Sequence, residues 1–187
     1  MTYCMIPHIC NPVTGEVVNL PKNLLVEEDY EKPHRFGDDF ISRFGYIFSA
    51  DEYKVVRIYA RCGYPSKDRC LKVQVYTLGN ILGWRDKGRP NIYISKNSEA
   101  DGSRNGVFAN GALHWIENEK HKIVAFDLAV EKFILIPLPS DYSRMDIGYL
   151  NFTLKLLGGY LSVYQLTGEQ GRIFVDIWSL KKKKQCN

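Results

Sequence analysis

The sequence of 187 residues contains no run of about twenty apolar residues, and segment 1–12 has no apolar stretch of the length that signal peptides need. It also contains no Cys-x-x-Cys pair, and its five cysteines are an odd number, which fits reduced thiols better than a disulfide framework. We therefore expect neither secretion nor a membrane partner, and we expect the protein to act in the cytoplasm, the nucleus or both.

A large excess of one charge is missing too. The net charge is +4, and four lysines stand together at 181–184, so the remainder of the chain is close to neutral. A nucleic-acid partner would need a basic stripe with interleaved aromatic residues, whereas Lys and Arg are otherwise scattered. We expect no nucleic-acid partner. We expect 181–187 to be a disordered basic tail, for which a nuclear import signal is the weaker interpretation.

Motifs of common enzyme classes are missing as well. No Gly-x-Ser-x-Gly elbow occurs, and the glycine-containing segment 79–88 lacks the spacing of a phosphate-binding loop, so we interpret it as a turn. His114 has no carboxylate or cysteine at ligand spacing, which predicts a structural strand residue bonded by backbone or water. Two further groups lack the paired close spacing of a zinc site: Cys4, His8 and Cys10, and Cys62 with Cys70. We predict no catalytic, metal-binding or cofactor-binding residues and no enzyme activity.

Aromatic residues, by contrast, make up 13% of the chain, and apolar residues alternate with polar ones or form short blocks bounded by Gly, Asn, Asp or Pro. This pattern is typical of strands joined by tight turns. In segment 71–78, Val73 and Val75 alternate with Lys72 and Gln74, which predicts a half-buried strand. Another strand is predicted at 53–60. Asn110-Gly111 and Gly158-Gly159 predict two hairpins, over 106–116 and 154–166, because these dipeptides accept the positive φ angles of two-residue turns.

The hairpin pattern repeats. Segments 10–21 and 126–137 each read as strand, polar turn, strand and proline; a third version starts at Val75, and a fourth at Ile177. The copies lie roughly 50 to 65 residues apart, near the kelch-type period that gives four-stranded propeller blades. We predict an all-β, incomplete kelch-like β-propeller with about three four-stranded antiparallel blades, open at both ends. In detail, a half blade spans about 5–21, full blades span about 36–88 and 104–138, and a three-stranded blade spans about 150–180.

The chain resembles the plant F-box-associated domain, a kelch-like propeller that follows an F-box. Motifs in the order of this family cover nearly all of the sequence, which we therefore treat as one partial domain over 1–187. The matching segments are Asn11-Pro12-Val13-Thr14-Gly15-Glu16 with Leu20-Pro21, Phe44-Gly45-Tyr46, Asp51 to Arg57, Val75-Tyr76-Thr77-Leu78 with Trp84-Arg85, Asn110 to Trp115, Ile123 to Leu128, Lys132-Phe133, Pro137-Leu138-Pro139 and Gly159 to Ser162.

The resemblance implies a protein-binding module that holds a target protein for a cullin-based ubiquitin ligase, while an F-box binds the Skp-family adaptor. Only ten residues precede Asn11, so we expect target binding without adaptor binding, as in a truncated gene model, a degenerate copy or a decoy. A propeller that binds a small molecule or glycan is the alternative. The polar segments 25–32 and 95–104 are the candidate binding loops, and the sequence singles out no individual binding residue.

Overall fold

The computed structural model describes residues 8–21, 39–62, 69–88, 92, 106–117, 122–138, 152–169 and 172–180. These residues form thirteen strands in four sheets, and none of them is helical. Within these ranges, accordingly, no apolar helix has the length to span a membrane. The predicted basic tail at 181–187 lies outside the described residues.

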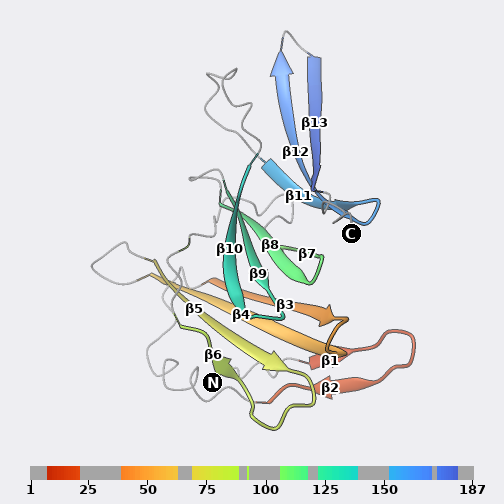
Figure 1. The fold of residues 1–187 in the computed structure, drawn as a ribbon, viewed down its shortest axis with the longest axis vertical. Helices are drawn as coiled ribbons and strands as arrows, with labels where there is room; N and C mark the ends of the chain where they lie inside the picture. Colours follow the sequence, from red (N-terminus) through yellow and green to blue (C-terminus); the bar gives the residue numbers. More distant parts are fainter. Residues whose placement is uncertain are drawn as a thin grey trace, which may run out of the picture.

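Each sheet is an antiparallel meander in which every strand pairs with its neighbour in the chain (Figure 1). The first sheet has β1 (His8–Cys10) and β2 (Val17–Asn19). The second has β3 (Asp39–Ile47), β4 (Glu52–Cys62), β5 (Arg69–Thr77) and β6 (Arg85–Asp86). The third has β7 (Val107–Ala109), β8 (Ala112–Glu117), β9 (Lys122–Asp127) and β10 (Lys132–Pro137). The fourth has β11 (Phe152–Leu157), β12 (Tyr160–Glu169) and β13 (Arg172–Leu180). The predicted half blade, two full blades and three-stranded blade are confirmed.

Local side-chain and backbone chemistry explains the turns. Asn110 and Gly111 have φ angles of 53° and 80°, and Gly158 and Gly159 have 55° and 82°, which confirms both predicted two-residue hairpin turns. The repeated hairpins share a different device, in which a side-chain oxygen accepts a backbone hydrogen bond two residues onward. Asn11 Oδ1 accepts from Val13 N (3.0 Å), Asn80 Oδ1 from Leu82 N (2.8 Å) and Asp127 Oδ1 from Ala129 N (2.8 Å).

The four sheets pack face to face in chain order, with the first and fourth at opposite ends of the stack (Figure 1). We call the face that a sheet turns toward the next sheet its forward face, and the opposite one its rear face. Val56, Ile58, Val73 and Val75 on the forward face of the second sheet pack against the rear face of the third. The third and fourth sheets share a second core cluster. Burial between stacked faces supplies most of the stabilisation of such a fold.

Trp84 attaches the first sheet to the rear face of the second. Its indole Nε1 donates a hydrogen bond to Pro21 O (2.9 Å), and its ring lies 5.4 Å from the ring of Tyr76, centroid to centroid. The Arg57 guanidinium lies 4.2 Å from the centroid of the indole, in a cation–π contact. Leu20 is buried in the same contact, with Tyr76. The carbonyl of the proline that ends the first repeated hairpin is therefore bound by Trp84 of the next one.

The predicted strand at 71–78 is present as β5, but it is not half-buried. Val73 and Val75 are buried as predicted, and Gln74 between them is also fully buried. The prediction was wrong because it assumed one solvent-facing side, whereas the second sheet has a neighbouring sheet on each face. Lys72 remains partly exposed and pairs with Asp86 at 3.5 Å. The strand predicted at 53–60 is confirmed within β4.

Gly45 lets β3 approach the third sheet closely. A Cβ atom at this position would lie 2.5 Å from Leu128 Cδ1 and 2.7 Å from Phe108 Cε2. We expect Gly45→Ala to lower the free energy of unfolding by about 1–3 kcal/mol, because overpacking forces neighbouring side chains off their preferred rotamers. Urea denaturation measures this change. Adding Phe108→Ala should recover part of the loss, and strictly additive losses in the double variant would contradict the steric explanation.

Candidate functional site

The tight turns of the sheets lie on one side of the stack. In Figure 1 the turns of β1–β2, β3–β4, β7–β8 and β11–β12 point to the right, and the turn of β5–β6 points to the lower right. Hydrogen bonds join neighbouring turns: Leu78 N donates to Tyr53 O (2.8 Å), and Leu128 N donates to Gly111 O (3.1 Å). Within the second and third sheets these bonds hold the turns in place before any partner binds, so this part of the surface is preorganised.

Five apolar side chains project into solvent from the turns of β1–β2, β3–β4, β5–β6 and β9–β10. Phe48 is 90% exposed after β3, and Ile81 is 99% exposed between β5 and β6. We use the name turn surface for the exposed residues Val13, Phe48, Ile81, Leu82 and Val130. Exposure of these apolar side chains to water is unfavourable in the isolated chain. Several of them on one side of a domain are typical of a contact surface for another macromolecule.

A compact ion cluster fixes the turns of the second and third sheets against each other. Glu131, at the end of the β9–β10 turn, accepts hydrogen bonds from Lys54 Nζ (2.8 Å), Arg85 Nη2 (2.5 Å) and Lys87 Nζ. Lys54 Nζ also donates to Leu128 O at 2.8 Å. The side chain of Glu131 is 9% exposed. Burial alone would raise its pKa, but the hydrogen bonds from the three cations lower the pKa of Glu131 to about 2.

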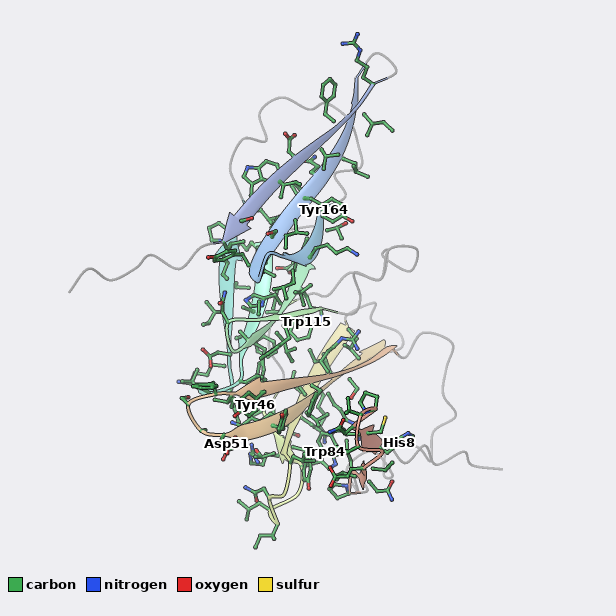
Figure 2. All side chains as sticks on the ribbon, turned by 90° about the vertical axis from the view of Figure 1, so that its right-hand side faces the viewer. His8, Tyr46, Asp51, Trp84, Trp115 and Tyr164 are labelled. Carbon is green, nitrogen blue, oxygen red and sulfur yellow. The ribbon has the colours of Figure 1, made fainter. Side chains whose placement is uncertain are left out.

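Aromatic side chains cover one face of the β3–β4 hairpin. The rings of Phe44 and Tyr53 are stacked with centroids 5.1 Å apart, and the rings of Tyr46 and Tyr53 are 4.7 Å apart. Tyr46 donates its hydroxyl hydrogen to Asp51 Oδ1 at 2.6 Å, which raises the pKa of Tyr46 (Figure 2). Phe44 and Tyr53 remain about two-fifths exposed. The hairpin is therefore a rigid, apolar ridge that other protein surface can cover.

His114, Cys62 and Cys70, which the sequence analysis considered as possible ligands, lie within strands of the sheets. His114 is buried, and its Nδ1 lies 3.2 Å from Val107 O, the backbone contact predicted for it; burial lowers the pKa of His114. Cys62 lies opposite Arg69 and Cys70 opposite Arg61, so the register does not set the two cysteines across from each other. In the part of the chain that the structure describes, no three His, Cys, Asp or Glu residues are grouped to hold a metal ion.

The remaining predictions divide between confirmed and untested ones. Segment 79–88 contains the β5–β6 turn, as predicted, with Gly79 and Gly83 at positive φ. Cys4 and the candidate binding loops at 25–32 and 95–104 lie outside the described residues.

The sequence analysis missed the turn surface. Its signal was the placing of apolar residues at turn positions, above all Ile81-Leu82 within a segment rich in glycine and asparagine.

Comparison with known protein families decides the classification. The model of the F-box associated β-propeller domain matches residues 1–186. The chain belongs to the F-box associated β-propeller family. The resemblance stated from sequence motifs is thus confirmed, as is the β-propeller class of the fold.

Relatives of this F-box associated domain include F-box proteins of Arabidopsis thaliana. F-box protein At1g53550 is 31% identical over 78% of this chain and 34% of its own length. F-box protein At1g46840 is 30% identical over 96% of this chain and 33% of its own length, and F-box/kelch-repeat protein At3g23880 is 29% identical over 74% and 35%. The chain thus spans about a third of the length of these relatives. No solved structure matched it significantly.

Proposed function

We propose that this domain is the target-binding module of an F-box subunit of a ubiquitin ligase, and that the turn surface is where the target protein docks. Its family membership carries the proposal, because the matched relatives are F-box and F-box/kelch-repeat proteins. We also propose that it acts in the cytoplasm or nucleus, and by binding alone, without catalysis.

The chemistry of the turn surface supports a protein partner. Interface energy usually concentrates in a few apolar or aromatic anchors surrounded by polar groups. Phe48 and the pair Ile81-Leu82 are such anchors, and the ion cluster around Glu131 lies among the strand ends that carry them. Since the cluster fixes these strand ends before binding, little conformational entropy is lost on association.

Target binding is expected to fall at least tenfold when the turn surface is made acidic. The variants are Phe48→Asp and the pair Ile81→Asp with Leu82→Asp, because a charge placed in an apolar contact loses its hydration. Proteins captured by the folded chain from plant extract, followed by titration of the identified target, provide the measurement. The matched control is Ile134→Asp with Leu135→Asp on β10, where both side chains are about half exposed. Equal losses in both pairs would contradict docking at the turns.

The ligase role needs a separate test. The chain is fused behind the F-box of one of its relatives, and ubiquitination of the identified target is followed with a reconstituted adaptor and cullin. We expect ubiquitination that the turn-surface variants abolish. A target that is bound but never ubiquitinated would contradict the ligase role while leaving protein binding intact.

A further inference from the structure

The fourth sheet has one open edge that its neighbours do not have at the same position. In the second sheet β6 pairs with β5, and in the third sheet β10 pairs with β9 along six residues. The strand at the corresponding position of the fourth sheet is β13, and among the described residues it pairs with β12 alone. The other edge of β13, over the nine residues Arg172–Leu180, therefore has no described strand beside it.

The side chains of β13 are exposed, unlike those of the strands at the same position in the other sheets. Val73 in β5 and Val124 in β9 are fully buried. In β13, by contrast, Ile173 on the forward face is 78% exposed and Phe174 on the rear face is 46% exposed. The β12–β13 hairpin extends away from the other sheets (Figure 1). A largely apolar strand is thus left in contact with water on both faces.

The edge strands β6 and β10 have features that discourage pairing with another chain. β6 has only two residues, and β10 begins at Lys132 and ends at Pro137. Short edge strands, lysine and proline are usual protections of an open sheet edge. β13 has none of them, because it is nine residues long and contains no lysine or proline. Its edge is therefore free to pair with a further strand.

The chemistry of this edge determines what can bind there. In an antiparallel pair, alternate residues direct their N–H and C=O groups away from the partner strand, and an extended backbone is the ligand that matches such a row. Phe174 and Val175 favour apolar side chains beside them, on the rear and forward face respectively. Asp176 forms no ion pair with a described residue, so it favours a lysine or arginine beside it.

We propose that the open edge of β13 is a strand-acceptor site, at which an extended segment of a partner protein pairs as the fourth strand of this sheet. The segment carries apolar residues beside Phe174 and Val175 and a basic residue beside Asp176. β10 shows the geometry that the segment adopts, because it pairs antiparallel with β9 at the corresponding position of the third sheet. The site is separate from the turn surface, none of whose residues lies on β13.

Octapeptides offered to the folded chain test this site. One has the sequence of residues 131–138, which includes β10, and the others are selected on the chain from a random displayed library, so that unsuitable side chains cannot explain a failure. We expect bound peptides to protect the backbone amides of 172–180 from hydrogen exchange. Methylating the backbone nitrogens of alternate peptide residues should weaken binding by about tenfold or more in one of the two alternations, because only one set of N–H groups faces β13.

A matched pair of variants tests the position of the site. Val175→Lys places a charge on the edge strand and should weaken peptide binding by about tenfold. Leu166→Lys is the control, because Leu166 lies opposite Val175 on the central strand β12 and is similarly exposed, at 59% against 54%. It should leave binding unchanged. Circular dichroism of both variants shows whether they remain folded.

Three results would overturn the proposal. The first is that no peptide protects 172–180, and the second is that neither alternation of methylated nitrogens weakens binding, since docking would then depend on side chains alone. The third is a dimeric wild-type chain in which these amides are already protected, because a second copy would then occupy the edge. Phe48→Asp on the turn surface should leave peptide binding unchanged, so this site and target docking can fail independently.

Discussion

Replacing Trp115 with alanine is expected to lower the free energy of unfolding by about 3–5 kcal/mol, the usual cost of removing a fully buried tryptophan. Trp115 is 1% exposed and belongs to the core between the second and third sheets, with Phe126, Leu113 and Leu128. The cavity would remove contacts with two sheets at once. For a chain of this size the melting temperature should fall by about 10 °C or more, which thermal unfolding followed by circular dichroism measures.

Trp115→Phe gives the matched comparison. The indole Nε1 of Trp115 is buried and has no hydrogen-bond partner in the described part of the chain, so the ring contributes through packing rather than through a polar bond. Removing an unsatisfied donor offsets part of the lost volume, and we expect phenylalanine to cost less than about 1.5 kcal/mol. Losses of similar size for phenylalanine and alanine would mean that the indole nitrogen has a stabilising partner.

Repetition in the sequence predicted the number of sheets and their boundaries because a propeller is built from local pairings. Each strand bonds with the next one in the chain, so turn residues such as Asn110-Gly111 and Gly158-Gly159 determine both the hairpin and its register. The repeated hairpins were found for the same reason, since Asn11 and Asp127 shape their turns through bonds two residues away. Local chemistry is visible in a single sequence.

Contacts between sheets could not be predicted in this way. The burial of Gln74 depends on the sheets on both sides of β5, and no local pattern indicates them. The same holds for the turn surface, because Val13, Ile81 and Val130 belong to turns of three different sheets. Candidate loops at 25–32 and 95–104 were chosen for polarity, whereas the exposed anchors described by the structure are apolar. Polarity locates a loop, but only the arrangement of the sheets shows which exposed side chains gather on one side.

Glu131 is the clearest example of a residue whose contacts could not be predicted from the sequence, because its three partners are supplied by the second sheet and its flanking residues. Lys54 precedes it by 77 residues and Arg85 by 46. We expect Glu131→Gln to lower the free energy of unfolding by about 2–4 kcal/mol at neutral pH, since it leaves the largely buried ammonium group of Lys54 with only the more distant carboxylate of Glu52, at 4.0 Å, as a counter-charge. The control is Asp86→Asn, which breaks the more exposed pair with Lys72 and should cost less than about 1 kcal/mol.

The contribution of Glu131 should also depend on pH in a specific direction. Its pKa falls from the ordinary 4.5 to about 2 in the folded chain, so the unfolded state binds the proton more tightly. The stabilisation is therefore complete above pH 4.5 and is lost as the pH falls toward 2. Urea denaturation of wild type and Glu131→Gln at a series of pH values should show a constant difference near neutrality that shrinks across this window. A difference that stays constant down to pH 2 would show that the carboxylate acts through packing, and that its charge does not hold the second and third sheets together.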